Sequence, residues 1–223
     1  MSERRKIAVY CDSYFTSDAA MDLAAGTFGT IVLPFREAGD EMLRQNIRRL
    51  GDKSVFFSID YPCKRTAIES AIRYYAADGV ELQLGANVLE ITDWVVAMDK
   101  TVIASPSDHP ERWLDILRSA GPRMSWWNLQ MYQGADYAAW VCSLVESGLM
   151  HSDRAQSFLV PGYKLTWSTP QSVAHDLQGL KDYAPCLDGV ILRSYDELKP
   201  RAEEWMKAIA NGLGTTARGV SFA

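Results

Sequence analysis

The residue with the clearest chemical consequence is Glu81, in the stretch Asp78-Gly79-Val80-Glu81-Leu82-Gln83-Leu84. Its neighbours Val80 and Leu82 are apolar, so we expect a buried strand. A carboxylate there costs several kcal/mol unless it is paired or protonated. Two interpretations stay open: a salt bridge inside the fold with Arg193 or Arg36, or an acid/base group whose pKa is raised by burial.

Two further carboxyl groups follow apolar runs, Asp60 after SVFFSI and Asp12 after IAVYC. Each can cap a loop or take part in chemistry. Together with Glu81 they could support acid/base catalysis or hold a divalent metal, although their spacing is not diagnostic. The three histidines are isolated in the sequence: His109, His151 and His175. We therefore predict no zinc site and no cofactor.

The stretch MSWWNLQMYQG (124–134) ends in alternating polar residues before a glycine. In one continuous strand Asn128, Gln130 and Tyr132 would share one side. That side would line a pocket with Gln130 and Tyr132. Arg193, in another apolar run, either binds an anionic group of a ligand or neutralises Glu81.

These residues need a scaffold, and eight short runs rich in β-branched and aromatic residues recur along the chain. The predicted strands are 6–11, 29–35, 54–59, 79–84, 101–105, 126–132, 156–163 and 188–195. Eight strands alternating with helices can form an open doubly wound sheet or a closed barrel. The count and the even spacing favour one (β/α)8 TIM barrel domain, 1–223, with short loops.

Helical patterns with capping residues fill the intervals. Residues 37–50 are amphipathic, with Met42, Leu43, Ile47 and Leu50 expected on one side. A second helix is expected to start at Ser107 or Asp108 and to stop at Gly121. A third starts at Thr169-Pro170, and Asp196 is expected to cap the last one.

In such barrels the site lies at the carboxyl ends of the strands. This rule selects the candidate residues before any reaction is considered. The predicted catalytic residues are Glu81, Asp60 and Tyr132. The predicted substrate-binding residues are Tyr10, Asp12, Gln83, Gln130, Tyr163, Trp167 and Arg193, with Trp167 at the pocket rim.

Composition narrows the class of partner. The chain has 223 residues, 48% of them hydrophobic, and a formal net charge of −5. Its basic residues are scattered, so we predict no nucleic-acid partner. No stretch is long and apolar enough for a membrane span or a signal peptide. The four cysteines are widely separated, which is typical of reduced thiols, and we expect a cytoplasmic protein. The oligomeric state is left open.

Several of these stretches resemble the chitinases and chitinase-like proteins of glycoside hydrolase family 18. IAVYCDSY is similar to the first strand of that family and TIVLPF to the second. WWNLQMYQG resembles its sixth strand, which commonly ends Gln-x-Tyr-Asn. DGVILRSYDE resembles its eighth strand. The resemblance implies a (β/α)8 barrel, and it places Gln130 and Tyr132 beside the reacting acetamido group.

The fourth strand departs from the pattern that the resemblance would require. The family motif is D-G-x-D-x-D-x-E, whose last Glu is the general acid of a substrate-assisted mechanism. Here Glu81 and Gln83 replace the two final aspartates, and Gly85 stands at the general-acid position. Arg193 stands where the family commonly has a tryptophan. Chitin hydrolysis by the family mechanism is therefore not expected.

Three functional hypotheses follow. The first is an enzyme that performs acid/base chemistry on a small molecule or modified sugar: cyclisation, elimination, isomerisation or hydrolysis. The second is a non-catalytic saccharide-binding protein. The third is a residual glycoside hydrolase that recruits Glu90 or Asp93 as its acid.

Overall fold

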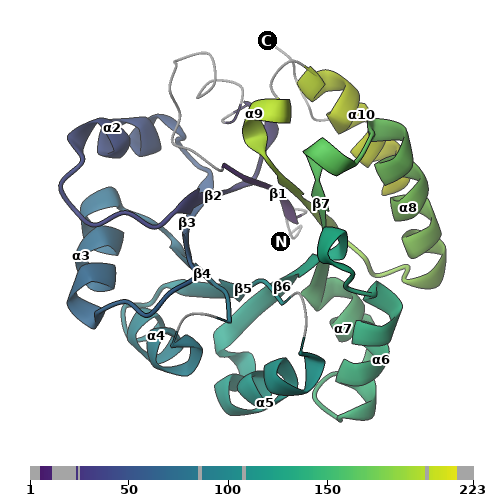
Figure 1. Cartoon of the computed structure of the whole chain (residues 1–223), viewed down its shortest axis with the longest axis horizontal. Helices are drawn as coiled ribbons and strands as arrows, with labels where there is room; N and C mark the ends of the chain where they lie inside the picture. Colours follow the sequence, from purple (N-terminus) through teal and green to yellow (C-terminus); the bar gives the residue numbers. More distant parts are fainter. Residues whose placement is uncertain are drawn as a thin grey trace.

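The computed structural model describes residues 6–11, 24, 26–84, 87–106, 109–198 and 201–214. Eight parallel strands form a closed barrel in sequence order, ringed by helices (Figure 1). The predicted TIM barrel is thus confirmed. The strands are β1 (Lys6–Tyr10), β2 (Thr30–Pro34), β3 (Ser54–Ile59), β4 (Gly79–Leu82), β5 (Thr101–Ala104), β6 (Met124–Gln130), β7 (Leu159–Lys164) and β8 (Gly189–Arg193). The barrel closes where β1 pairs with β8, from Lys6 opposite Gly189 to Tyr10 opposite Arg193.

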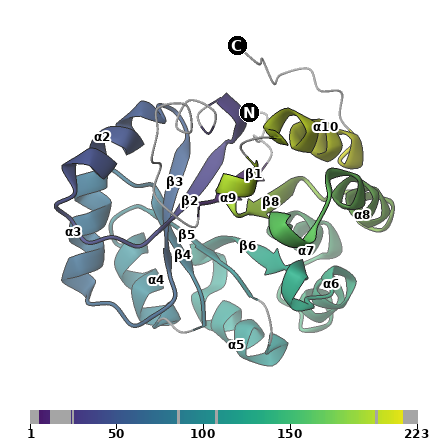
Figure 2. The same cartoon turned by 45° about the horizontal axis from the view of Figure 1, so that its top comes forward.

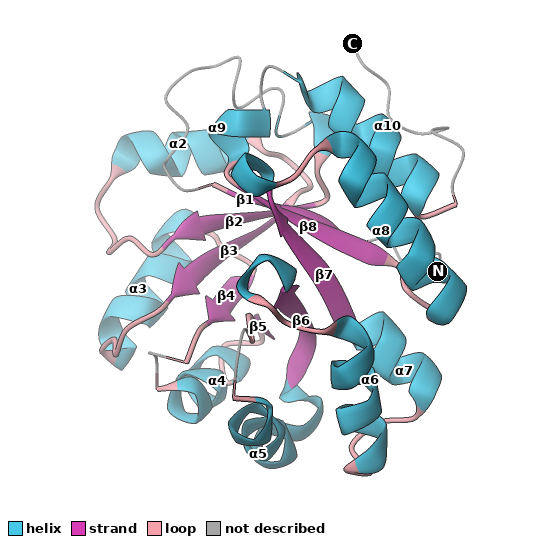
Figure 3. Cartoon of the chain, turned by 45° about the vertical axis from the view of Figure 1, so that its right-hand side comes forward, coloured by secondary structure: helices cyan, strands magenta, loops and turns pink. Residues whose placement is uncertain are grey.

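Helices cover the outside of the barrel, with the strands inside them (Figure 3). They are α2 (Glu41–Arg49), α3 (Arg65–Tyr75), α4 (Val88–Val96), α5 (Pro110–Ala120), α6 (Tyr137–Glu146), α7 (Ser152–Phe158), α8 (Pro170–Tyr183), α9 (Tyr195–Leu198) and α10 (Ala202–Gly212). Short 3₁₀ turns are η1 (Gly121–Arg123), η2 (Met131–Gln133) and η3 (Leu165–Trp167). Helices α8 and α10 lie side by side (Figure 2). Within the described ranges, no helix is long and apolar enough to cross a bilayer.

Alternation along the strands sorts the side chains into two layers. Odd positions of β1 and β2, such as Val9 and Ile31, pack outward in the large cluster beneath the helices. The even positions of these two strands, such as Ala8 and Val32, face the lumen. The lumen cluster consists of Ala8, Tyr10, Val32, Phe56, Ile103, Val160 and Ile191, with Trp126 against it. Polar residues of the same inward phase belong to this layer, and they define the candidate site.

Capping residues account for several helix limits. Thr169 caps α8 by accepting from the Ser172 backbone N–H, with Pro170 in the first turn, as predicted. Gly121, with φ of 58°, follows α5 as its predicted stop. Asp40 caps α2, so that helix begins at Glu41 rather than at residue 37. Met42, expected on its buried side, is 70% exposed. The caps proposed at Ser107 and Asp108 lie outside the described residues.

Four predicted boundaries are wrong in ways that matter for the site. Residues 156–158 belong to α7, not to β7. Strand β6 stops at Gln130, so Tyr132 lies in η2 and is not the next strand position. Strand β8 stops at Arg193, and α9 begins at Tyr195. Asp196 therefore lies within α9, whereas the last helix, α10, begins after Arg201.

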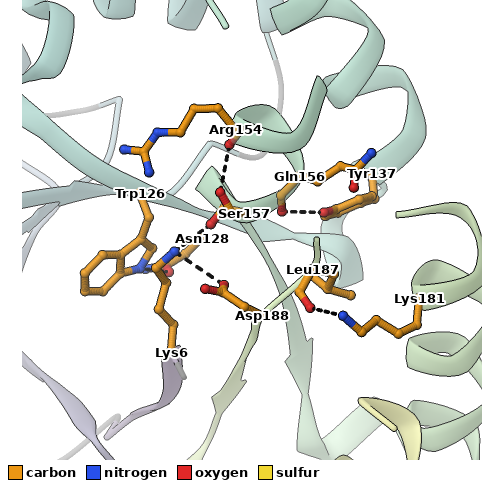
Figure 4. A network of polar contacts seen from close by, with 10 residues as sticks. All are labelled: Lys6, Trp126, Asn128, Tyr137, Arg154, Gln156, Ser157, Lys181, Leu187 and Asp188. Atoms are coloured by element: carbon orange, nitrogen blue, oxygen red, sulfur yellow. Dashed lines mark hydrogen bonds and ion pairs between the residues drawn. The ribbon is translucent and has the colours of Figure 1, made fainter. Parts of the chain in front are cut away.

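Lys6 of β1 contacts the end of α7 and the residue before β8 at the amino end of the barrel (Figure 4). Its Nζ donates to the Ser157 carbonyl at 2.6 Å, lies 3.4 Å from Asp188 Oδ1, and sits 6.0 Å from the Trp126 ring centre. The side chain is only 20% exposed. Interactions at this end of a TIM barrel serve stability rather than chemistry.

Replacing Lys6 with Met keeps most of the aliphatic stem but removes the charge and its donors. We expect the free energy of unfolding to fall by about 1–3 kcal/mol, because the Ser157 carbonyl and Asp188 lose a charged partner. Urea denaturation measures the change. Lys207→Met is the matched control, since exposed Lys207 pairs only with Glu203 on the surface of α10. Equal losses in the two variants would contradict the role assigned to Lys6.

Candidate functional site

Glu81 lies in the middle of the inward face of β4. It pairs in register with Ser58 of β3 and Ile103 of β5, and it is 0% exposed. The Ser58 hydroxyl donates to Oε2 of Glu81 at 2.5 Å. Oε1 is also buried and has no hydrogen-bond partner among the described residues. Among the hydrogen bonds between described residues, the carboxyl is thus anchored through Oε2.

Burial raises the pKa of Glu81 above its ordinary value, because the enclosed site disfavours the charged form. The hydroxyls of Ser105, Ser58 and Tyr10 and the charge of Arg193 lower this pKa without cancelling the effect of burial. Among the described residues, no cation lies within the 4.0 Å of an ion pair with Glu81. The predicted interior salt bridge is therefore absent, and the acid/base interpretation of the raised pKa fits this geometry.

The two arginines considered as partners lie elsewhere. Arg36 is half exposed and pairs with Asp40 at 3.3 Å. Arg193 donates from Nη1 to the Tyr132 hydroxyl at 2.9 Å. Its guanidinium also lies 5.5 Å from the centre of the Tyr10 ring. Arg193 influences Glu81 through its field rather than through contact.

A chain of hydroxyl and amide groups crosses the lumen beside Glu81. The Tyr10 and Ser105 hydroxyls are 2.7 Å apart. The Asn128 amide donates to Tyr10 at 3.4 Å, and the Trp126 indole donates to Asn128 at 3.0 Å. Burial raises the pKa of Tyr10, and the nearby Glu81 carboxyl raises it further. Tyr10 is therefore a neutral hydrogen-bonding group that faces the lumen, as the sequence predicted for a binding residue.

A second polar chain leads toward the carboxyl end of the barrel. Gln130 donates to the Ser105 carbonyl at 3.1 Å and accepts from the Tyr132 hydroxyl at 2.7 Å. The Tyr132 oxygen in turn accepts from Arg193. The predicted neighbours Gln130, Tyr132 and Arg193 are therefore together, although Tyr132 reaches this position from a 3₁₀ turn rather than from the strand.

Trp167 lies at the rim, 66% exposed, as predicted. Its ring meets the Tyr132 ring edge-on, with centres 6.1 Å apart, and Lys164 Nζ lies 4.2 Å from its centre. Tyr132 and Trp167 also line a cavity of about 650 Å³ that extends toward Asp176 and Gly179 of α8. That volume falls within the usual range of small-molecule pockets.

Gln83 and Asp60 lie at the same end of the neighbouring strands. Gln83 Nε2 donates to the Ser58 hydroxyl at 3.3 Å, which links it to Glu81 through one intermediate atom. Asp60 directly follows β3 and is exposed. Asp12 lies outside the described residues, as does Gly85. Within the described part of the chain, no three acidic, histidine or cysteine side chains are grouped as metal ligands.

Tyr163 does not face the lumen, contrary to the prediction. It belongs to the cluster beneath the helices, because the next residue, Lys164, takes the inward position of β7. Its hydroxyl is buried and has no hydrogen-bond partner in the part of the chain that the structure describes. Burial raises its pKa, and the charge of Asp176 on α8 adds to the effect. Tyr163 forms part of the outer cavity wall rather than of the barrel mouth.

Sequence reasoning missed Ser58 and Ser105 as site residues. Both follow the inward phase of their strands, two positions after Phe56 and Ile103, and both contribute to the surroundings of Glu81. A strict period of two, counted from the lumen residues of each strand, would have selected them. Apart from this periodicity, a serine inside an apolar run has no sequence feature that indicates a role in a site.

The geometry supports two chemical tasks. Glu81 can exchange a proton with the hydroxyl of Ser58, a partly buried residue at the same level of the neighbouring strand. Lys164 and Arg193 present cationic donors from the ends of β7 and β8, beside the Tyr132 hydroxyl, whose proton goes to Gln130. Donors of this kind bind carboxylate or phosphate oxygens.

No known family profile matches the chain, and no curated protein shows significant sequence similarity to it. Solved structures do resemble its fold. A GH18 chitinase from the chitin utilization locus of Flavobacterium johnsoniae superimposes with a TM-score of 0.64 at 8% identity, covering 95% of this chain and 94% of that one. Tamarind chitinase-like lectin gives 0.61 at 14% identity, covering 91% and 98%.

The resemblance is not confined to chitinases. Phosphoribosyl anthranilate isomerase from Thermococcus kodakaraensis superimposes with a TM-score of 0.59 at 13% identity, covering 92% of this chain and 99% of that one. Identities this low establish the barrel fold alone. The chain is therefore a TIM barrel that resembles GH18 chitinases and other barrel enzymes, and its function must be argued from its own residues.

The raised pKa of Glu81 predicts a pH-dependent stability. The folded state holds the Glu81 proton more tightly than the unfolded chain does. The contribution of Glu81 to the free energy of unfolding is therefore complete below its ordinary pKa of 4.5, and it is lost as pH rises toward the folded-state pKa. Each tenfold difference in acid dissociation constant is worth about 1.4 kcal/mol. Glu81→Gln, which cannot ionise, should become more stable relative to wild type across this interval.

Urea unfolding of both proteins at a series of pH values measures the difference. The expected curves converge at acid pH and separate as pH rises. Glu203→Gln, the same substitution at an exposed position on α10, is the control. A wild-type protein that gains stability relative to Glu81→Gln between pH 4.5 and neutrality would contradict the raised pKa.

Proposed function

We propose that this chain is an enzyme that performs acid/base chemistry on a small molecule or modified sugar bound at the carboxyl end of its barrel. The reaction class is cyclisation, elimination, isomerisation or hydrolysis. The observation that carries the proposal is Glu81: a fully enclosed carboxyl on the inward face of β4, bound by Ser58 at one oxygen and influenced by the neighbouring Tyr10 and Ser105 hydroxyls. We also propose a cytoplasmic location, with which four free cysteines agree.

Glu81 acts in this proposal through Ser58. The Ser58 hydroxyl donates to Glu81 Oε2 and accepts from Gln83 at the mouth. When Glu81 is ionised, Ser58 can pass its proton to Oε2 while its own oxygen takes a proton from the substrate. The reverse transfer returns the proton to the product. A base with a raised pKa suits this task, because its proton affinity lies closer to the working pH.

The residues at the mouth would hold the substrate. Arg193 supplies a fixed cation, Tyr132 a hydroxyl, and Trp167 an exposed ring for apolar or sugar surfaces. Asp60, the exposed residue directly after β3, is the second candidate for proton transfer. The titrating group and the binding groups thus lie on different strands around one opening.

A purely structural role for Glu81 fits less well. Replacing a buried ionisable group with an apolar residue of similar size is often neutral or stabilising, so such a group is costly to keep for packing. Glu81 has no ion-pair partner within the described residues, and one of its oxygens is unsatisfied. Perturbed, unpaired groups of this kind occur preferentially at functional sites.

The first test is turnover in D2O, followed by NMR, with a panel of sugar acids, amino sugars and small cyclic acids. Glu81→Gln should lower kcat/KM by about 10²–10⁴-fold, the usual contribution of one acid/base group. For wild type, kcat/KM should rise with pH as Glu81 loses its proton and then level off. In the variant this rising limb should be absent.

Tyr132→Phe provides the matched comparison. It removes one hydroxyl at the mouth without altering Glu81. It should therefore raise KM and leave unchanged the pH at which kcat/KM rises. If Glu81→Gln folds normally and turns over the substrate at the wild-type rate, the proposed chemistry is refuted.

One observation favours a second candidate, a non-catalytic saccharide-binding protein. The exposed ring of Trp167 stands beside Tyr132, an arrangement suited to stacking a sugar. One of the similar structures is named a chitinase-like lectin. The residual-hydrolase hypothesis has less support, because Glu90 hydrogen-bonds Asn87 and Asp93 pairs with Arg123 on the outside of the barrel.

Calorimetry with chito-oligosaccharides and a chromogenic N-acetylglucosaminide assay across pH separate these candidates. We expect no hydrolysis, since Gly85 cannot donate a proton and Gln83 replaces the orienting aspartate. Tight binding that Trp167→Ala abolishes, without any turnover, would favour the lectin-like candidate over the enzyme.

A further inference from the structure

We infer that the ends of β7 and β8 form a phosphate subsite, in which Lys164 and Arg193 bind the phosphate group of a small phosphate monoester. The inference rests on the proposed function, since it uses the same barrel mouth, and it names the class of substrate. Arg193 alone could bind any anionic group. The position of Lys164 beside it is what favours a phosphate over other anions.

Lys164 and Arg193 are register partners on neighbouring parallel strands. Adjacent strands lie about 4.8 Å apart, so the two side chains leave the sheet next to each other. Both take the inward phase, because the residues before them, Tyr163 and Leu192, pack beneath the helices. Both are partly buried rather than fully hydrated. The barrel thus places two cations side by side at one point of its rim.

Two like charges in this arrangement repel each other. Among the described residues, Lys164 Nζ has no carboxylate oxygen within 4.0 Å. It lies instead over the face of Trp167, 4.2 Å from the ring centre. This ring fixes the ammonium beside the mouth but leaves its charge uncompensated. An anion between Lys164 and Arg193 would relieve the repulsion and accept hydrogen bonds from both.

A phosphate group matches these donors better than a carboxylate does. A phosphate monoester carries a charge of about −1.5 to −2 at neutral pH and offers three strong acceptor oxygens. The guanidinium of Arg193 and the ammonium of Lys164 together carry several N–H donors, of which one on Arg193 Nη1 is already bound to the Tyr132 oxygen. Barrel enzymes frequently bind phosphate after strands seven and eight, where these cations stand.

The rest of the ligand has a place beside the phosphate. Tyr132 and Trp167 border both the cation pair and the 650 Å³ cavity that reaches α8. Met131 and Leu180 give this cavity apolar walls, and Ser168 and Asp176 give it polar ones. A compact ring or sugar attached to the phosphate would fit this mixed surface.

Calorimetry with inorganic phosphate and phenyl phosphate, at neutral pH and low ionic strength, tests the subsite. Wild type should bind both, phenyl phosphate more tightly. Lys164→Gln should weaken both by at least about tenfold, since it removes a charged donor. Gly179→Leu should weaken phenyl phosphate alone. Gly179 lines the cavity on α8, and an added Cβ there meets no atom within 4 Å, so the larger side chain enters open space.

Lys207→Gln, on the surface of α10, is the control and should bind both probes as wild type does. Glu81→Gln should still bind phosphate. A loss of turnover in that variant therefore tests the proposed function and not the phosphate subsite. The inference is overturned if wild type binds neither probe, or if Lys164→Gln binds both as tightly as wild type.

Discussion

The enclosure of one carboxyl group in the barrel lumen is the constraint on which the site depends. Glu81 is surrounded by the inward residues of neighbouring strands, and its only direct hydrogen bond among the described residues comes from Ser58. Burial favours its neutral form, so the lumen tolerates an acid without a counter-ion. A neutral Glu81 adds no negative charge beneath Lys164, whose ammonium has no carboxylate partner among the described residues.

Residues at the amino end of the barrel serve its stability, and residues at the carboxyl end form the candidate site. At the amino end, Lys6 links β1 to the beginnings of β7 and β8 through a carbonyl and a carboxylate, and its charge is satisfied. At the carboxyl end, Lys164 has an aromatic ring but no carboxylate among the described residues. Buried polar groups are normally satisfied, and the exceptions call for a functional explanation. Both the unsatisfied oxygen of Glu81 and the uncompensated Lys164 lie on the side where barrels act on their ligands.

Much of the fold could be predicted from the sequence, because a repeated alternation of apolar strands and capped helices has few compact solutions. The positions of Glu81, Gln130 and Arg193 followed from strand periodicity and the carboxyl-end rule. Tyr163 did not, because the alternation along β7 that turns Lys164 inward turns Tyr163 outward beneath the helices. Tyr132 was placed correctly for the wrong reason, since a 3₁₀ turn rather than the strand carries it. The absence of an ion pair at Glu81 could not be foreseen, because side-chain reach depends on three-dimensional packing.

The most direct test of the account is the protonation of Glu81 itself. Infrared difference spectra of wild type against Glu81→Gln isolate the carbonyl stretching band of this one carboxylic acid as pH is raised. The account predicts a protonated band that persists after the exposed glutamates have ionised and that disappears only at higher pH. A Glu81 that ionises together with the exposed glutamates, or before them, would contradict the central claim.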